Sequence, residues 1–292
     1  MEEKAICKLC PRKCGIDREK EIGFCSVPSK FYISRIALHK WEEPSISGTR
    51  GSGTVFFSGC NLRCVFCQNK KISRSAAGRS YTEDELISEM LRLEREGAHN
   101  INLVTPTHYA ASLVPLLKRA RAMLRIPIVW NSGGYESVET LKTLEGLVDV
   151  YLPDLKYFSP ELSARYSSAP DYFEVACKAI KEMHRQVGEA VIEDGLIKKG
   201  IIVRHLVLPS CRKDSIRIIE ELSKILPVNE LKISIMRQFT PDFVDGEKYP
   251  ELCRRVTSFE YDSVVKKAAE LGFDGYTQGA EAASAAYTPD FD

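Results

Sequence analysis

The sequence lacks the features that mark several large classes of protein. No apolar run approaches the ~18–20 residues that a membrane helix needs, and the first residues are charged where a signal peptide is apolar. We therefore expect a cytoplasmic protein without a membrane partner. The 41 Lys and Arg residues balance the 40 Asp and Glu residues. This balance argues against nucleic-acid binding by charge alone. There is also no Gly-rich phosphate loop and no internal repeat.

Cysteine, in contrast, is abundant and unevenly distributed. The chain has 10 cysteines in 292 residues, and seven of them lie before position 68. In a cytoplasmic chain, clustered cysteines indicate metal ligands or redox groups rather than disulfides. They fall into two groups. The N-terminal cysteines are Cys7, Cys10, Cys14 and Cys25, and the motif cysteines are Cys60, Cys64 and Cys67.

The N-terminal cysteines have the spacing C-x2-C-x3-C-x10-C within a polar segment, residues 1–48. A segment of this composition buries little apolar surface, so we expect a small metal-binding module there. Zinc and a second [4Fe-4S] cluster both remain open. Zinc sites often use two C-x2-C pairs, and only one is present, whereas clusters tolerate irregular spacing. Cysteines packed simply as small apolar side chains are the structural alternative.

Residues 49–292 alternate short apolar runs with amphipathic stretches, which predicts a parallel α/β sheet covered by helices. About six β-α units suit a full or partial barrel. We expect residues 189–200 to form a charged connection and residues 240–258 a long loop. The expected strands are 54–57, 101–104, 126–130, 148–152, 201–208 and 231–235; the expected helices are 83–96, 109–123, 137–144, 160–187, 214–225 and 261–271.

Polar side chains follow most of the expected strands. Since the carboxyl ends of parallel strands meet at one rim, these groups are expected to share a pocket. The alternative is that these polar residues serve only as helix caps and turn residues, which such loops need in any case. The groups are Ser58-Gly59-Cys60, Thr105 to His108, Asn131 to Gly134, Asp154 to Lys156, Arg204-His205 and Met236 to Gln238.

The motif cysteines have the spacing C-x3-C-x2-C directly after the first expected strand. Soft thiolates select zinc or iron–sulfur clusters. Three cysteines are an incomplete set for either, and a [4Fe-4S] cluster held by three keeps one iron open for a small molecule. A structural zinc site is the alternative interpretation.

In this context the sequence resembles radical S-adenosylmethionine (radical SAM) enzymes, whose signature is C-x3-C-x-aromatic-C with Phe66 here as the aromatic residue. The resemblance covers nearly the whole chain and implies a partial (β/α)6 barrel over residues 49–292. It is closest to the branch of pyruvate formate-lyase activating enzymes. The phrases that carry it are CKLCPRKC at 7–14, Glu42-Glu43-Pro44, FFSGCNLRCVFCQN at 56–69, Val104 to His108, Asp154-Leu155-Lys156 and Val203 to Leu206.

The resemblance implies that the motif cysteines hold a [4Fe-4S] cluster and that S-adenosylmethionine binds its open iron. One-electron reduction then yields methionine and a 5′-deoxyadenosyl radical that abstracts hydrogen. By the same resemblance Lys156, beside Asp154, and Arg204 pair with the methionine carboxylate, and Asn131 and Ser132 bind the ribose or methionine part. Thr105 lies where relatives carry a Gly-Gly-Glu segment for the amino group, so this chain departs from the pattern. Adjacent strand residues face opposite ways, so Arg204 and His205 are not both expected in the pocket.

The resemblance favours an activating enzyme that abstracts hydrogen from a glycine of a partner protein, a glycyl-radical enzyme. The alternative is a radical SAM enzyme that modifies a small molecule or another macromolecule, because the Thr-Pro-Thr-His segment and the cysteine module depart from the activases. A non-catalytic iron–sulfur or zinc protein is a third hypothesis. Either enzyme needs an electron donor, for which a flavodoxin or ferredoxin is expected.

Overall fold

The computed structural model describes residues 6–284 and residue 291. Its ten strands form one sheet in the order β10-β9-β8-β6-β5-β4-β2-β1-β3, with β7 paired to β8. Among the described residues the two end strands, β10 and β3, are not hydrogen-bonded to each other, so the barrel is open. The strands are β1 (Phe31–His39), β2 (Ser52–Phe57), β3 (Arg79–Tyr81), β4 (Ile101–Val104), β5 (Ile128–Ser132), β6 (Val150–Pro153), β7 (Val191–Glu193), β8 (Leu196–Leu206), β9 (Lys232–Met236) and β10 (Gly275–Thr277).

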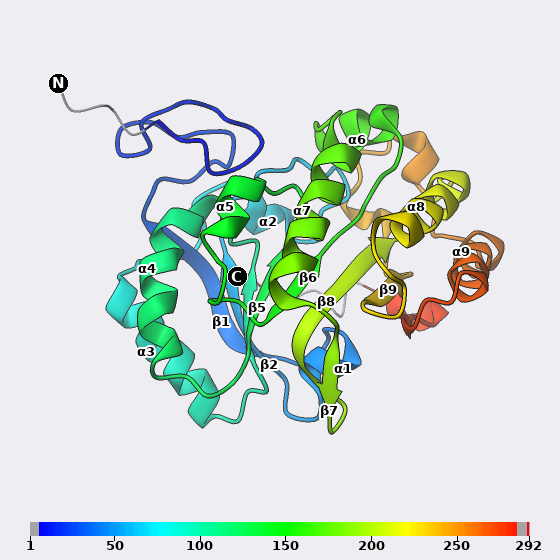
Figure 1. The fold of residues 1–292 in the computed structure, drawn as a ribbon. Coiled ribbons are helices and arrows are strands. Elements are labelled where there is room, and N and C mark those ends of the chain that lie inside the picture. Colours follow the sequence, from blue (N-terminus) through cyan, green and yellow to red (C-terminus); the bar gives the residue numbers. More distant parts are fainter. Residues whose placement is uncertain (1–5, 285–290, 292) are drawn as a thin grey trace.

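Strands β2, β4, β5, β6, β8, β9 and β10 run parallel, as the alternating pattern predicts. Figure 1 shows α3, α4, α5 and α7 in front of the sheet and α8 and α9 beside β9. The longer helices are α3 (Glu83–Arg95), α4 (Ala110–Arg121), α5 (Val138–Lys142), α6 (Pro160–Ser167), α7 (Tyr172–Val187), α8 (Arg212–Ile225) and α9 (Ser258–Glu270). The short ones are α1 (Pro44–Ser47), α2 (Lys70–Ser73), η1 (Thr107–Tyr109), η2 (Pro241–Phe243), η3 (Pro250–Leu252) and η4 (Ala280–Ala282).

The β/α units confirm the expected alternation, and most bounds differ by a few residues. Strand β4 has the predicted limits, and α3 begins at a capping box formed by Thr82 and Glu85. The helical stretches expected within 160–187 are the two helices α6 and α7, and Ser168 takes a left-handed backbone conformation that ends α6. The sheet and helices enclose one main core that includes Trp130. Among the described residues no helix is long and apolar enough to span a membrane.

Strand β1 is a feature that the sequence analysis missed. It pairs antiparallel with β2, with Ile36 opposite Val55, and it places the buried side chains of Phe31 and Ile33 in the core. Arg35 is exposed and the residues after it are only partly buried, so the alternation does not continue along the strand. The described part of segment 1–48 that precedes the sheet is residues 6–30.

The charged connection expected at 189–200 contains regular structure that the sequence analysis did not predict. Strands β7 and β8 form an antiparallel hairpin there. Its turn is Asp194-Gly195, and both residues have positive φ, 50° and 76°. Asp-Gly is the preferred pair for a two-residue hairpin turn of this kind, so the signal was present in the sequence.

Residues 6–30 dock on the barrel through hydrogen bonds at several points. Arg12 donates to the Asn61 carbonyl at 2.9 Å and lies over the ring of Phe24, 4.0 Å from its centroid. Thr140 donates to the Leu9 carbonyl at 2.8 Å. Figure 1 shows this segment, in blue, as loops beside the upper ends of β1 and α5. Contacts to the barrel thus hold a segment that has few apolar residues of its own.

Candidate active site and cysteine sites

One pocket lies where the parallel strands end, and it combines the residues that the sequence analysis singled out. All three motif cysteines line it, as do all six residues that the resemblance assigns to S-adenosylmethionine: Thr105, Asn131, Ser132, Asp154, Lys156 and Arg204. They come from the ends of β4, β5, β6 and β8 and from the loop after β2. Other lining residues are His39, Trp41, Glu42, Gln68, Asn69, Gln238, Phe239 and Thr240.

The loop after β2 carries the motif cysteines into this pocket. Gly59 precedes them at φ 83°, and a Cβ there would lie 2.6 Å from the Cys25 carbonyl oxygen. Only glycine fits this close approach. Burial raises the pKa of the Cys60 thiol to about 12, and the neighbouring Cys64 and Cys67 thiols add to the shift. The three sulfurs therefore lie close enough to interact.

Each of the three sulfurs has a polar neighbour. The Leu62 N–H donates to Cys60 Sγ at 3.4 Å, and the Ser167 hydroxyl donates to Cys64 Sγ at 2.9 Å. Cys67 Sγ lies 3.7 Å from the Ser73 hydroxyl. Hydrogen bonds of this kind surround the thiolates of iron–sulfur clusters and adjust their potential.

The chemistry of the donor set suits a cluster. All three motif cysteines line the same pocket. Soft thiolates are the ligands of iron–sulfur clusters. The motif cysteines, with a polar neighbour at each sulfur and open space beside them, fit such a cluster.

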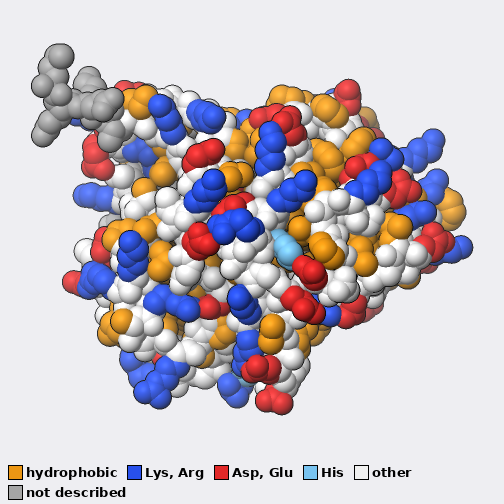
Figure 2. Space-filling model, in the orientation of Figure 1, with side chains coloured by type: hydrophobic (Ala, Val, Ile, Leu, Met, Phe, Trp, Pro, Cys, Tyr) orange, Lys and Arg blue, Asp and Glu red, His pale blue; other side chains and the backbone are white. Residues whose placement is uncertain are grey.

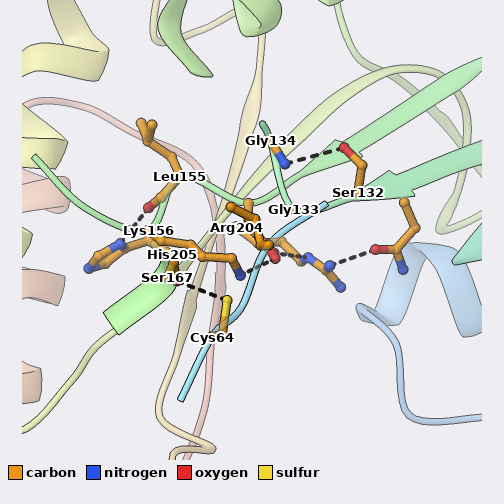
Figure 3. A network of polar contacts seen from close by, with 12 residues as sticks. Cys64, Ser132, Gly133, Gly134, Leu155, Lys156, Ser167, Arg204 and His205 are labelled. Carbon is orange, nitrogen blue, oxygen red and sulfur yellow. Dashed lines mark hydrogen bonds and ion pairs between the residues drawn. The ribbon is translucent and has the colours of Figure 1, made fainter. Parts of the chain in front are cut away.

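A network of charged side chains borders the cysteines. Arg204 Nε lies 3.0 Å from Asp154 Oδ1, and Lys156 Nζ lies 2.5 Å from Asp154 Oδ2. Arg204 also donates to Asn131 Oδ1 at 2.6 Å and pairs with Glu42 Oε2 at 3.3 Å. Figure 3 shows Lys156 and Arg204 converging from two strand ends, with Cys64 nearby. Asp154 therefore fixes both cations at the edge of the pocket.

The network sets the charge states of its members. Burial alone would raise the pKa of Asp154, but Arg204 and Lys156 together outweigh it and hold that pKa below its usual value. Burial alone would lower the pKa of Lys156, but the Asp154 carboxylate reverses this and raises it. The pair is therefore charged at neutral pH.

Glu42 is a pocket residue to which the sequence analysis gave no role. Its carboxylate accepts hydrogen bonds from Asn102 at 3.1 Å and from Asn131 at 3.3 Å, besides the ion pair with Arg204. Burial raises its pKa, and Arg204 opposes that shift. The signal was the adjacent pair Glu42-Glu43, but its placement depends on strand β1, which was not predicted.

Three further positions complete the geometry of the site. His205 Nδ1 lies 2.7 Å from the Leu155 carbonyl oxygen, and its ring points away from the side on which Arg204 lies (Figure 3). Thr105 has φ 58°, a strained conformation for a β-branched residue. Trp41 lines the pocket and is 60% exposed.

A buried carboxyl group lies behind the pocket. Glu136 Oε1 accepts hydrogen bonds from Thr107 at 2.6 Å and from Trp130 at 3.3 Å, while its Oε2 is buried without a partner. Burial raises the pKa of Glu136 to about 7, although these hydrogen bonds oppose the shift. The folded protein therefore binds a proton that the unfolded chain releases above about pH 4.5.

This proton makes stability depend on pH. We expect the contribution of Glu136 to be fully present below pH ~4.5 and to be lost by pH ~7, a change of about 3 kcal/mol. Glu136→Gln keeps the acceptor and removes the titration, so the variant should gain stability relative to wild type as pH rises from 5 to 8. Chemical denaturation at both pH values measures the difference. If the difference in free energy of unfolding between Glu136→Gln and wild type is the same at pH 5 and pH 8, the raised pKa of Glu136 is contradicted.

The N-terminal cysteines also come together. Burial raises the pKa of the Cys10 thiol to about 12, and Cys7, Cys14 and Cys25 each add to the shift. Cys7 is fixed by paired backbone hydrogen bonds to Gly15 and Ile16, at 3.1 and 2.8 Å. Cys7, Cys14 and Cys25 therefore all lie near enough to Cys10 to act on its thiol.

Comparison with known proteins gives a consistent result. The model of the radical SAM superfamily matches residues 54–198. Over 280 residues the chain is 32% identical to an uncharacterised protein of Methanocaldococcus jannaschii, covering 92% of this chain and 75% of that protein. Over 58 residues it is 36% identical to the pyruvate formate-lyase-activating enzyme of Clostridium pasteurianum, covering 20% of this chain and 24% of that enzyme.

Solved structures resemble the fold. A variant of spore photoproduct lyase superposes with a TM-score of 0.55 at 11% identity, covering 82% of this chain and 79% of that one. Streptococcus suis SuiB bound to the precursor peptide SuiA gives a TM-score of 0.52 at 14% identity, covering 84% of this chain and 50% of that one. At such low identity these likenesses concern the fold alone.

Proposed function

The chain belongs to the radical SAM superfamily, and from that premise we propose that it is an enzyme that abstracts a hydrogen atom from its substrate at this pocket. The family implies S-adenosylmethionine and a [4Fe-4S] cluster as cofactors. One observation carries the proposal: the motif cysteines and all six expected cofactor residues line the same pocket. An electron carrier or a structural zinc protein would not need that combination.

In this proposal the motif cysteines hold the cluster, and S-adenosylmethionine occupies the space beside it. When bound, the pair supplies a 5′-deoxyadenosyl radical after one-electron reduction. Lys156 and Arg204 bind the methionine carboxylate, since each has N–H donors beyond those used in the network. Asp154 positions both cations. Asn131, Ser132 and Thr105 provide polar contacts for the ribose and the amino group.

The test is direct. The protein is purified without oxygen, its cluster is reconstituted, and S-adenosylmethionine and dithionite are added. The proposal requires 5′-deoxyadenosine and methionine in equal amounts, measured by chromatography. Absence of 5′-deoxyadenosine from a preparation with a full iron and sulfide content would overturn it.

We further propose that the substrate is a glycine of a partner protein, as in the activating enzymes. The support is the 58-residue similarity to the activating enzyme of Clostridium pasteurianum. The reaction then leaves a stable glycyl radical on a glycyl-radical enzyme. Electron paramagnetic resonance of a candidate partner, mixed with the reduced protein and S-adenosylmethionine, tests this role. If no candidate partner acquires the signal while 5′-deoxyadenosine is formed, the substrate is of another class.

A specific observation favours a second candidate, a small molecule or another macromolecule. Two carboxyl groups that line the pocket, of Glu42 and Asp154, pair with Arg204 at 3.3 and 3.0 Å. Burial raises the pKa of Glu42, and Arg204 opposes that shift. Carboxyl groups of this kind suit a cationic or hydrogen-bonding substrate group. Incorporation of deuterium from a labelled small-molecule substrate into 5′-deoxyadenosine would distinguish this candidate.

We also propose that the N-terminal cysteines hold a metal centre, either zinc or a second [4Fe-4S] cluster. The support is their mutual proximity in a segment that has little core of its own.

Ser167 offers a test of the cluster environment that does not depend on activity. It donates to Cys64 Sγ and is itself 2.8 Å from the Tyr157 hydroxyl, and both side chains are buried. A hydrogen bond to a cluster thiolate stabilises the reduced, more negative state. We expect Ser167→Ala to lower the reduction potential by about 40 mV, equivalent to about 1 kcal/mol. A spectroscopic redox titration measures it, and a potential equal to that of wild type would contradict the assignment.

A further inference from the structure

The loop that carries the motif cysteines, residues 59–67 (the motif loop), is bonded to the N-terminal segment, residues 6–30. Resting on the proposed function, we infer that Arg12 and Arg63 are positioning residues that hold this loop in the shape that receives the cluster. Three observations support the inference. The motif loop has no regular structure of its own, Arg12 joins it to the end of α6, and Arg63 joins it to the N-terminal segment.

The motif loop depends on other segments for its shape. Residues 59–67 lie in neither a helix nor a strand. Buried backbone N–H and C=O groups still need partners, and other segments supply several of them. The Cys60 N–H donates to the Cys25 carbonyl oxygen at 3.2 Å. The Val65 N–H donates to the Tyr166 carbonyl oxygen at 2.9 Å. The loop is therefore bonded both to the N-terminal segment and to α6.

Arg12, from the N-terminal segment, joins the motif loop to the end of α6. Its Nε donates to the Asn61 carbonyl oxygen at 2.9 Å. Its two terminal nitrogens donate to the carbonyl oxygens of Ser167, at 3.3 Å, and of Ser168. The planar guanidinium suits such a set, because its donors lie on three nitrogens in fixed directions. A lysine ammonium has all its donors on one nitrogen and cannot reproduce this bridge.

Each end of the Arg12 bridge lies next to a motif cysteine. Asn61 follows Cys60 in the chain. Ser167, whose carbonyl oxygen accepts from Arg12, donates through its hydroxyl to Cys64 Sγ at 2.9 Å. Loss of the bridge is therefore expected to disturb the backbone beside Cys60 and the hydrogen bond to Cys64 together.

Arg63 makes the reciprocal contact, from the motif loop to the N-terminal segment. It donates to the Phe24 carbonyl oxygen at 2.5 Å and to the Ser26 hydroxyl at 2.7 Å. The guanidinium carbons of Arg63 and Arg12 lie 4.7 and 4.0 Å from the centroid of the Phe24 ring. Cation–π contacts of this kind add to the hydrogen bonds. Two arginines, one from each segment, thus share one aromatic ring.

These two arginines differ from ordinary surface charges. Figure 2 shows exposed lysine and arginine side chains at the upper left of the molecule, where residues 6–30 lie in Figure 1. Arg12 and Arg63 are instead half-buried, and their guanidinium groups donate to backbone oxygens. Hydrogen bonds to a charged group contribute more to stability than exposed ion pairs do. The contacts therefore suit a fixed connection between the two segments.

The experiment measures how firmly the cluster at the motif cysteines is held. Wild type, Arg12→Met, Arg12→Lys and Arg63→Met are reconstituted without oxygen, reduced and mixed with an iron chelator. Electron paramagnetic resonance follows the signal that changes when S-adenosylmethionine is added, because a cluster with an open iron responds to that ligand. We expect both methionine variants to lose this signal at least about tenfold faster than wild type. Arg12→Lys should resemble Arg12→Met, since charge alone does not restore the bridge.

Arg18→Met is the matched control. Arg18 docks the same segment on the barrel by donating to the carbonyl oxygens of Pro28, at 2.7 Å, and of His108. Its loss loosens the segment elsewhere, and we expect cluster loss near the wild-type rate. Equal acceleration in Arg18→Met and Arg12→Met would overturn the inference, because docking of the whole segment would then hold the loop. Recovery of the wild-type rate in Arg12→Lys would overturn the bridge in favour of charge.

The outcome can be separated from that of the proposed function. Wild-type rates of cluster loss in both Arg12→Met and Arg63→Met, in a protein that still forms 5′-deoxyadenosine, would overturn the inference and leave the proposed function intact. Absence of 5′-deoxyadenosine from fully loaded wild type would overturn the proposed function instead. Because Arg63→Met changes the contact from the motif loop, it provides the test even if Arg12→Met fails to fold.

Discussion

Cys64→Ala should abolish formation of 5′-deoxyadenosine, with a loss of at least about a hundredfold relative to wild type. The physical reason is that a three-cysteine set has no spare ligand. The Cys64 sulfur lies in the pocket and accepts a hydrogen bond from Ser167 at 2.9 Å. Removing it leaves two cysteines, which cannot retain a cluster with one open iron. Chromatography of the products and the iron content together measure the effect.

The matched control is Cys253→Ala. Cys253 is exposed. Its sulfur donates hydrogen bonds to the backbone carbonyl oxygens of Gly246 and Tyr249. Loss of this thiol should leave both iron content and product formation at wild-type levels. Product formation by Cys64→Ala at the wild-type rate would show that the motif cysteines are not the catalytic ligands.

Most of the barrel could be predicted because its strands are short apolar runs separated by amphipathic helices. Ile101–Val104 is the simplest case, since four consecutive buried residues bounded by a turn and by Thr105 permit few other structures. Strand β1 was missed because its alternation of buried and less buried positions stops at the exposed Arg35, and the residues after it are all partly buried. It becomes a strand through pairing with β2, a contact that local sequence does not specify.

The site residues also divide into those that local sequence could identify and those that depend on contacts between distant segments. The C-x3-C-x2-C spacing is local, and so the motif cysteines could be identified directly. Thr105, Asn131, Asp154 and the other strand-end residues followed from the rule that chemistry gathers at one rim. Glu42 could not be placed, because its contact with Arg204 joins residues 162 positions apart. The link between Cys25 and Cys60 was equally hidden, since it depends on how the loops dock.

Asp154→Asn should lower the free energy of unfolding by about 3 kcal/mol and also weaken the binding of S-adenosylmethionine. Asp154 is the carboxylate that pairs with both Lys156 and Arg204, and its side chain is 13% exposed. Its loss leaves two nearly buried cations close together, and Glu42, 3.3 Å from Arg204, still pairs with that cation. Since its pKa lies below the usual value, the stabilisation is present at neutral pH and declines only as pH falls below about 4.

The double variant Asp154→Asn/Lys156→Met separates the two roles. Removing the unpaired ammonium should restore most of the stability, whereas affinity for S-adenosylmethionine should stay about 10- to 100-fold below wild type because a charged hydrogen bond is missing. Asp274→Asn breaks the exposed pair with Lys232 by the same substitution and should change stability by less than about 0.5 kcal/mol. Denaturant titration and calorimetric binding measure the two effects. If the double variant binds as tightly as wild type, Lys156 does not contact the methionine carboxylate, and Arg204 alone must neutralise it.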